Sequence, residues 1–163
     1  MRAGLIWGGN PHAHDKVSAA IDRRRSIEPA LLAPLFAISG ITFVSLQKGR
    51  GPAPFAGLID PMDEVRDFAD TAALLANLDV LVSVDTAVAH LAGAMGKPVL
   101  MMDRSDPCWR WSPDRMDTLW YPGHRIYRQP APGEWGRVVD AVGRDLAALI
   151  EEGQGSGPDP LVS

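Results

Sequence analysis

The stretch from residue 79 to residue 98 constrains the fold of this chain more than any other part of the sequence. A run of β-branched and apolar residues at 80–84 meets the polar pair Asp85-Thr86, and an alanine-rich segment then continues to Gly96, just before a proline. This pattern predicts a buried strand, a sharp turn, a helix and the start of another strand. Open α/β sheets bind ligands at the carboxyl ends of their strands, and the free N–H groups of a helix N-terminus attract phosphate. The turn is therefore a candidate ligand site.

Strands and helices alternate along the rest of the chain. Apolar runs predict strands at 3–7, 41–46, 80–84, 98–102 and 125–128, and near-helical spacing predicts helices at 29–38, 67–77, 86–95 and 133–152. This alternation predicts an α/β fold, a Rossmann-like three-layer α/β/α domain with a mostly parallel sheet. The fingerprint G-x-G-x-x-G is absent after the first strand, so a hydride-transfer enzyme is not expected.

Other segments have weaker patterns. Residues 12–25 are polar and are expected to form a surface loop with a helical turn, and 49–61 a loop with one short strand near Leu58 and Ile59. Phe68 is expected on the packed face of the helix at 67–77. We expect one domain over residues 1–152 and a disordered tail over 153–163.

Composition excludes several classes of protein. The chain has 163 residues and a net charge of −4, which suits one domain and gives no basic footprint for nucleic acid. No apolar run approaches the roughly 20 residues that cross a bilayer, and no signal peptide is visible, so a cytoplasmic protein is expected. The lone Cys108 fits a reducing compartment. A strand that begins by residue 3 suggests a piece of a longer protein.

The turn after the third strand carries the most informative polar residues. Asp85 is either a helix N-cap or a ligand contact, and an N-cap carboxylate would repel a nearby phosphate. We therefore expect Asp85 to accept hydrogen bonds from sugar hydroxyls, and Thr86 and the backbone amides to hold phosphate. His90 lies one helical turn after Thr86 on the same face, and is either a second ligand contact or an ordinary helix histidine.

Two other predicted strand ends bring polar residues to the same edge. The run Arg23-Arg24-Arg25 follows the first strand's exit loop, and Gln47-Lys48 ends the second strand. Each set alone is typical of a solvated surface. Together with the turn after the third strand, they predict a cationic site in which an arginine pairs with pyrophosphate.

Three further features are candidate sites. His12 and His14 have a spacing that can hold a metal, but no Cys, Asp or Glu cluster completes a zinc site. Cys108 has no evident partner base, which indicates a buried, inert thiol. The tryptophans of the loop-like region after residue 103 are expected to pack beneath a loop, with a stacking or partner surface as the alternative: Trp109, Trp111 and Trp120.

The sequence resembles the C-terminal domain of glycosyltransferase family 9, the ADP-heptose lipopolysaccharide heptosyltransferases. The likeness rests mainly on Phe68-Ala69-Asp70-Thr71-Ala72-Ala73-Leu74 and on the run from Ser83 to Pro98. Supporting pieces are Leu5-Ile6-Trp7-Gly8-Gly9-Asn10-Pro11, Arg23-Arg24-Arg25-Ser26-Ile27, Phe43-Val44-Ser45-Leu46-Gln47-Lys48-Gly49, Trp109-Arg110-Trp111 and Trp120-Tyr121-Pro122. The likeness covers residues 3 to about 150 and is closest to the version found at the end of bacterial tetratricopeptide-repeat proteins.

The resemblance implies a GT-B architecture, in which two Rossmann-like halves face each other and the C-terminal half holds a nucleotide-sugar. The family's Asp-Thr-(Gly or Ala)-x-x-His pattern, which contacts the donor's phosphates and sugar, carries over to Asp85, Thr86, Ala87 and His90. Ala87 stands where heptosyltransferases usually have glycine. A basic residue after the first strand contacts phosphate, and the best match is Arg25, with Lys48 second.

The resemblance also implies an inverting, metal-independent sugar transfer from an ADP- or UDP-linked donor, with no cofactor. The N-terminal half, which supplies the catalytic base in this family, is not in this sequence. We therefore expect no catalytic residue here, and transfer only when that half or a partner is supplied. Two alternatives are an inactive GT-B-like module used for protein interaction and a GT-B sugar-nucleotide epimerase.

Overall fold

The sheet determines the architecture of this protein. The computed structural model describes residues 1–11, 14–50 and 55–155. In these residues, five strands form one sheet in the order β2-β1-β3-β4-β5, and every neighbouring pair is parallel. The strands are β1 (Arg2–Ile6), β2 (Thr42–Ser45), β3 (Val80–Val84), β4 (Val99–Asp103) and β5 (His124–Arg128). The Rossmann-like α/β fold predicted from the sequence is thus confirmed.

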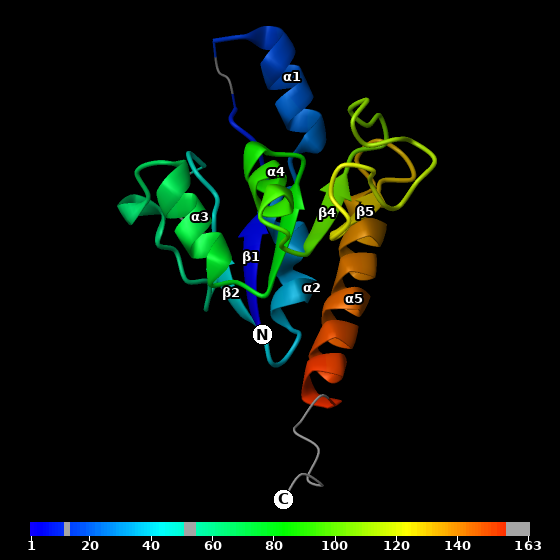
Figure 1. The fold of residues 1–163 in the computed structure, drawn as a ribbon. Coiled ribbons are helices and arrows are strands. Elements are labelled where there is room, and N and C mark those ends of the chain that lie inside the picture. Colours follow the sequence, from blue (N-terminus) through cyan, green and yellow to red (C-terminus); the bar gives the residue numbers. More distant parts are fainter. Residues whose placement is uncertain (12–13, 51–54, 156–163) are drawn as a thin grey trace, which may run out of the picture.

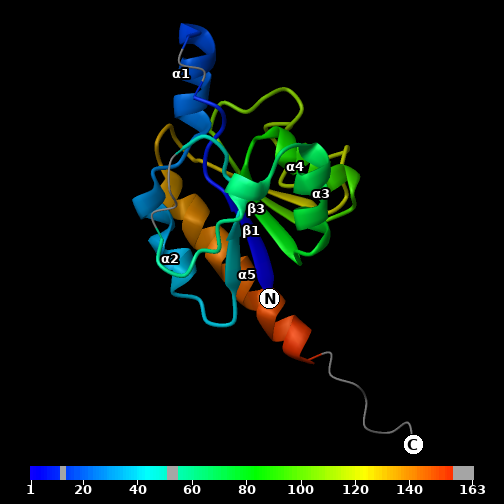
Figure 2. The same cartoon turned by 90° about the vertical axis from the view of Figure 1, so that its left-hand side faces the viewer.

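Helices cover both faces of the sheet. One face carries the 3₁₀ helix η1 (Pro29–Leu32), α2 (Ala33–Phe36) and α5 (Trp135–Gly155), and the other carries α3 (Phe68–Ala76) and α4 (Ala87–Ala94). Figure 1 shows the strands from the side, and the turned view in Figure 2 places α2 and α5 opposite α3 and α4. Two further elements are α1 (Lys16–Arg25) and the 3₁₀ helix η2 (Met62–Glu64).

The pleat of the strands explains why both layers have apolar cores. Val82 of β3 packs in the cluster that α2 and α5 cover, whereas its neighbour Leu81 packs in the cluster under α3 and α4. Successive side chains of a strand point to opposite faces, so a strand covered on both sides must be apolar throughout. This accounts for β3, which is buried throughout and apolar except at Ser83, whose hydroxyl donates to the Val84 carbonyl at 2.7 Å.

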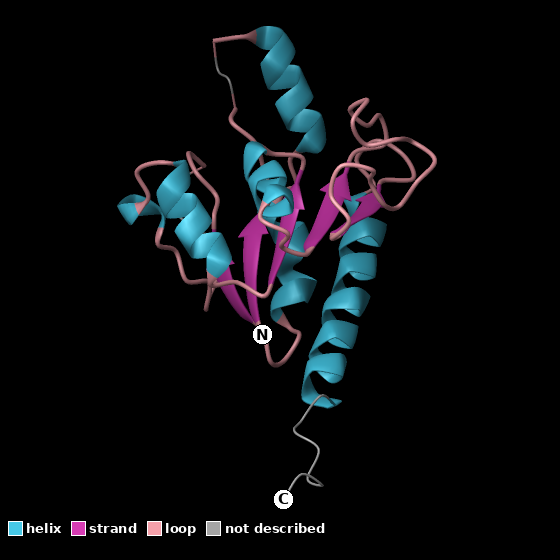
Figure 3. Cartoon of the chain, in the orientation of Figure 1, coloured by secondary structure: helices cyan, strands magenta, loops and turns pink. Residues whose placement is uncertain are grey.

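All strands end at the same edge, where the loops gather. The arrowheads in Figure 3 point toward α1 and toward the long loop after β4, residues 104–122. The carboxyl edge therefore carries the irregular segments that can bind a ligand.

The structure corrects the prediction for residues 12–25. Residues 16–25 form the helix α1, whose N-cap Asp15 accepts a hydrogen bond from the Val17 N–H. Its only buried residue is Asp22, so no apolar stripe marks this helix in the sequence. Figure 1 shows α1 standing above the carboxyl edge rather than in either layer.

Smaller corrections concern the other helices and one loop. The segment 29–38 is divided between η1 and α2, and Pro34 lies in the first turn of α2. Phe68 is 58% exposed rather than packed. Ile59 makes an isolated parallel bridge with Val44, in place of a short strand.

The closing helix α5 continues to Gly155, so the proposed domain limit at 152 falls inside a helix. The remainder of the predicted tail, residues 156–163, lies outside the described residues. Within the described ranges, no helix is both long and apolar enough to span a membrane.

Candidate ligand-binding site

A cleft of about 640 Å³ opens at the carboxyl edge beside β1 and β3. The chain passes from β1 to β2 on one side and returns to β3 on the other, so this is the point at which the strand order reverses. Open α/β sheets bind ligands at such a point. The cleft is lined by the β1 exit loop at Gly8 and Gly9, by Arg25 and Lys48, and by Thr86 and Ala87.

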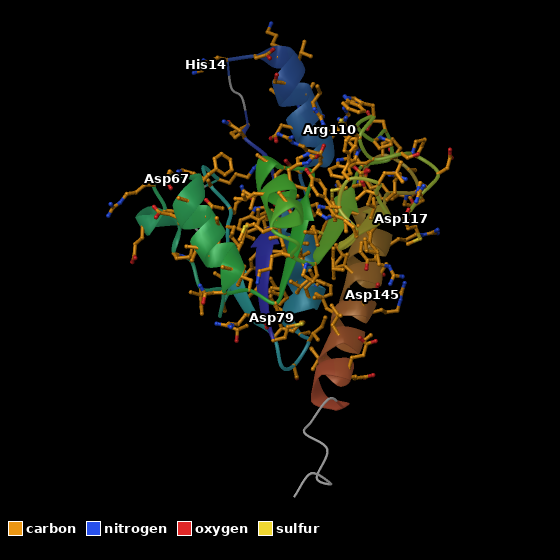
Figure 4. All side chains as sticks on the ribbon, viewed as in Figure 1. His14, Asp67, Asp79, Arg110, Asp117 and Asp145 are labelled. Atoms are coloured by element: carbon orange, nitrogen blue, oxygen red, sulfur yellow. The ribbon has the colours of Figure 1, made fainter. Side chains whose placement is uncertain are left out.

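A more apolar hollow of about 420 Å³ lies at the opposite, amino edge, near Asp79. Figure 4 shows Asp79 at that edge and Arg110 at the carboxyl edge. The amino-edge hollow is lined by Met1, whose amino group donates to the Gly40 carbonyl at 2.9 Å, but by no lysine, arginine or histidine side chain and by no helix N-terminus. The carboxyl-edge cleft, by contrast, combines the cations Arg25 and Lys48 with a helix N-terminus, which are groups that an anionic ligand needs.

The turn after β3 presents the N-terminus of α4 to this cleft. Thr86 is the N-cap, and its hydroxyl accepts from the Ala89 N–H at 3.4 Å and lies 3.2 Å from the Ser83 hydroxyl. No residue that the structure describes accepts a hydrogen bond from the N–H of Ala87 or Val88. These two amides remain available to a ligand.

The N-cap interpretation of Asp85 is wrong, because Thr86 has that role. The Asp85 carbonyl accepts a hydrogen bond from Arg25 Nη1 at 3.1 Å. Its carboxylate is only partly buried, at 21% exposure, and makes no cap. The Asp85 side chain is thus available for another contact.

Arg25 is held at the cleft and is not part of a solvated face. Besides its bond to the Asp85 carbonyl, its Nε donates to Asp22 Oδ1 at 3.2 Å. A Cβ on Gly9 would lie 2.1 Å from Arg25 Nη2, so only glycine at this position leaves room for the guanidinium. Arg23 and Arg24 are exposed, and Arg24 pairs with Asp106 instead.

Asp22 and Arg50 belong to the same arrangement, although the sequence did not indicate them. Asp22 is 3% exposed and pairs with both Arg25 and Arg50. Arg50 also donates to the Gly9 carbonyl at 2.9 Å and to the Ser26 hydroxyl at 2.8 Å. A buried carboxylate between two guanidinium groups fixes their positions. Arg50 lies two residues after Lys48 and could have been found by extending the strand-end argument; Asp22 carries no such signal.

Gln47 joins β1 and β2 at this edge. It is 6% exposed, and its Oε1 accepts from the N–H groups of Trp7 at 3.0 Å and Gly8 at 2.8 Å. Its Nε2 donates to the Gly8 carbonyl at 3.0 Å. The solvated-turn interpretation is therefore wrong for Gln47. It holds for the neighbouring Lys48, whose exposed side chain lines the cleft and donates to the Val65 carbonyl at 3.4 Å.

Asp85 and His90 face each other next to the Thr86 turn, but neither side chain is among the residues that line the cleft. His90 Nε2 lies 3.9 Å from Asp85 Oδ1, and its Nδ1 lies 3.1 Å from the Tyr121 hydroxyl. The imidazole stacks on Trp111 with ring centroids 5.0 Å apart. Burial lowers the pKa of His90, the Asp85 charge opposes this shift, and the Arg110 charge adds to it. The neutral imidazole is thereby favoured at pH 7.

The loop after β4 is tied to the sheet by a buried ion pair. Asp103 is 1% exposed and lies 3.2 Å from Arg128 Nη2. Burial raises the pKa of Asp103 to about 6, and the Arg128 charge opposes that rise. Arg128 also donates to the carbonyls of Trp111 at 3.1 Å and Pro113 at 2.6 Å, so it anchors the middle of the loop.

His14, Cys108 and the three tryptophans are not among the residues that line the cleft. His12 lies outside the described residues, and the described ones contain no group of three metal-ligating side chains. Cys108 is only partly buried, so the expectation of a buried thiol is not met. Trp111 is fully buried as predicted, whereas Trp109 is 75% and Trp120 59% exposed, contrary to a packing role for all three.

Comparison with known proteins gives two matches. Residues 66–113 match the model of glycosyltransferase family 9 (heptosyltransferase), and this segment contains α3, β3, α4 and β4. Protein FlbA of Caulobacter vibrioides is 28% identical over 162 residues. That alignment covers 90% of this chain but 26% of FlbA, so the chain spans about a quarter of that relative. No solved structure matches significantly.

Proposed function

We propose that this chain is the donor-binding domain of a family 9-like inverting glycosyltransferase, equivalent to the C-terminal half of a GT-B enzyme. The observation that carries the proposal is the cleft at the β1/β3 switch point. Arg25, Lys48 and the free amides of Ala87 and Val88 come from separate elements and meet there. The family-model match over residues 66–113, which includes the β3–α4 turn, supports it.

The arrangement suits a nucleoside diphosphate-sugar, ADP- or UDP-linked. Two cations and a helix N-terminus can balance a diphosphate without a metal ion, and they stabilise the same group when it leaves. Thr86 and the amides of Ala87 and Val88 would hold the phosphates, while Asp85 and His90 lie on one side to accept from or donate to sugar hydroxyls.

Transfer itself would need groups beyond this chain. In the proposed reaction an acceptor oxygen attacks the anomeric carbon, and the nucleoside diphosphate leaves from the opposite face. The base that takes the acceptor proton is proposed to lie in an N-terminal GT-B half or a partner, so the isolated chain is expected to be inactive. We further propose that the full-length protein is bacterial and acts in the cytoplasm, and that it contains tetratricopeptide repeats.

Ligand titration tests the proposal directly. Backbone amide spectra recorded during addition of ADP, UDP and their sugar derivatives should show shifts at Thr86 to His90 without added metal. The Arg25→Ala variant should lose most of the response, and Arg23→Ala, which removes an exposed arginine of the same helix, should keep it. Absence of shifts in that segment at millimolar ligand would exclude donor binding.

A second candidate function, a protein-interaction module, is favoured by one exposed surface. This surface lies on the loop after β4. Its large apolar side chains are between 58% and 82% exposed: Trp109, Met116, Leu119 and Trp120. Tryptophan, methionine and arginine are enriched at protein interfaces, and Arg110 lies over the Trp109 ring, 4.8 Å from its centroid. Loss of partner capture on Trp109→Ala, with nucleotide binding unchanged, would support this function.

A further inference from the structure

The side-chain rings of His90 on α4, Trp111, Tyr121 and His124 pack together in one group. His90 and His124 both stack on the Trp111 ring. Their centroids lie 5.0 and 5.8 Å from the Trp111 centroid, with interplanar angles of 21° and 16°. The Tyr121 ring contacts all three, at 5.7 Å from His90, 6.4 Å from Trp111 and 4.8 Å from His124. The loop at 104–122 thus contacts α4 through rings rather than through backbone hydrogen bonds.

Gly93 permits this contact. A Cβ at this position would lie 2.5 Å from the Tyr121 ring and 2.6 Å from His124 Cε1, closer than side chains can approach. Because Gly93 lies one turn after His90 on α4, the missing side chain brings the Tyr121 hydroxyl within reach of the His90 ring. The position of the Tyr121 ring therefore depends on the absence of a side chain at Gly93 of α4.

The polar contacts of His90 favour one protonation pattern. Its Nδ1 lies 3.1 Å from the Tyr121 hydroxyl, which can donate or accept, whereas its Nε2 lies 3.9 Å from Asp85 Oδ1, which can only accept when ionised. A lone pair on Nε2 would face the carboxylate, so the proton belongs on Nε2 and the Tyr121 hydroxyl donates to Nδ1. The other charged or titratable groups near His90 are Arg110 and His124.

We propose that Tyr121 is a positioning residue that holds the neutral His90 imidazole with its Nε2–H directed toward Asp85, next to the ligand cleft. This inference rests on the proposed function, because it assigns the His90 Nε2–H as the donor that meets the nucleotide-sugar. Tyr121 itself need not touch the ligand. Trp111 keeps the imidazole plane fixed, and the Tyr121 hydroxyl selects which nitrogen carries the proton.

The Tyr121→Phe variant tests the inference, because it removes the hydroxyl and keeps the ring against Gly93. Nitrogen-15 spectra of histidine-labelled protein at pH 7.5 distinguish the two neutral tautomers, and His90→Gln identifies the His90 signals. We expect the Nε2–H tautomer in the wild type and a mixture of tautomers in Tyr121→Phe. Identical His90 spectra in both proteins would overturn the inference.

Binding provides the second measurement. With ADP- and UDP-sugars as probes, Tyr121→Phe should bind about 3- to 10-fold more weakly, as expected for one lost hydrogen bond. A tautomer change without a loss of affinity would show that the hydrogen bond has no role in binding, and would also overturn the inference. If the wild type binds no probe, the proposed function fails, while the tautomer spectra still decide whether Tyr121 sets the His90 proton.

A change at Gly93 provides an independent variant. Gly93→Ala should displace the Tyr121 ring and alter the His90 spectrum in the same direction as Tyr121→Phe. Gly136→Ala, in a helix where an added Cβ meets nothing within 4 Å, is the matched control. A Gly93→Ala protein that is folded by circular dichroism and has a wild-type His90 spectrum would contradict the placement of Tyr121.

Discussion

A single glycine determines whether the Arg25 guanidinium can reach the proposed diphosphate. Gly9 is close enough to Arg25 that any side chain would overlap the guanidinium, and its carbonyl is bonded by Arg50. The buried Asp22 then fixes both arginines. The absence of one carbon atom therefore has an electrostatic consequence, because it sets where positive charge meets the cleft.

The first prediction concerns Gly9→Ala. The added methyl should displace the Arg25 guanidinium and weaken ADP or UDP binding by about 10- to 100-fold, the range for loss of a hydrogen bond to a charged group. Titration calorimetry at constant ionic strength measures the change. Gly136→Ala should leave the affinity unchanged, and equal weakening in both variants would contradict the prediction.

The second prediction concerns Thr86 as the cap of α4. Thr86→Ala should lower the free energy of unfolding by about 1 kcal/mol, because the Ala89 N–H loses its side-chain acceptor. Thr86→Ser should recover most of this loss. Urea denaturation measures both, and equal stability of the alanine and serine variants would exclude the capping role.

At the scale of elements, the long loop after β4 behaves as part of the core. Trp111 is fully buried between α4 and β5, and Arg128 donates to the carbonyl groups of Trp111 and Pro113 in the loop. Trp109, two residues earlier, is 75% exposed. The loop is therefore anchored by the buried Trp111, whereas the side chain of Trp109 is exposed to solvent.

The third prediction separates these two tryptophans. Trp111→Ala should lower the free energy of unfolding by about 3–5 kcal/mol, the usual cost of truncating a buried large aromatic side chain. Trp109→Ala should change it by less than about 0.5 kcal/mol, as is usual at the surface. Thermal and urea denaturation followed by circular dichroism check both values. Trp109 is consequently the appropriate variant for an interaction assay, and Trp111 is not.

At the scale of the whole molecule, two buried groups respond to pH in opposite directions. Burial raises the pKa of Asp103 from 3.8 to about 6, so its stabilising contribution is present below pH 3.8 and is lost as the pH rises through 6. Burial, followed by the charge of His90, lowers the pKa of His124 from 6.5 to about 4. Its contribution is present above pH 6.5 and is lost as the pH falls through 4.

The fourth prediction isolates His124, which is 3% exposed. In His124→Gln the group no longer titrates, so the variant should gain stability relative to the wild type as the pH falls from 7 to 4. The relative gain should reach about 3 kcal/mol. Urea denaturation at a series of pH values measures it, with the exposed His14→Gln as control. A difference between variant and wild type that is constant with pH would contradict the shifted pKa.

The sheet was predicted well from the sequence because its interior strands β3 and β4 are buried along their whole length and consist mainly of apolar residues. β3 was predicted with its observed bounds, Val80–Val84. The helix α1 was missed because it packs on neither layer and has no apolar stripe. Thr86 and Asp85 were assigned to the right turn, but which of them caps α4 depends on backbone angles that either residue type can adopt.

The cleft was predictable only in part. Three strand ends with polar residues were expected to meet, and Arg25, Lys48 and Thr86 do line one cleft. The contact of His90 with Tyr121 and Trp111 was not foreseeable, because it joins segments more than 20 residues apart through the packing of rings. The paired roles of Asp22 and Arg50 depend likewise on tertiary placement.

The interior position of β1, between β2 and β3, has a consequence for how the chain folds. Ala3 pairs with Phe43 on one side and with Val80 on the other, so the middle of the sheet closes only when distant segments meet. Sheets assembled from such non-local pairs fold more slowly than structures assembled from local contacts. Until β3 pairs with β1, one edge of β1 is exposed and can pair with other chains. Dilute refolding conditions should therefore improve the yield of native protein.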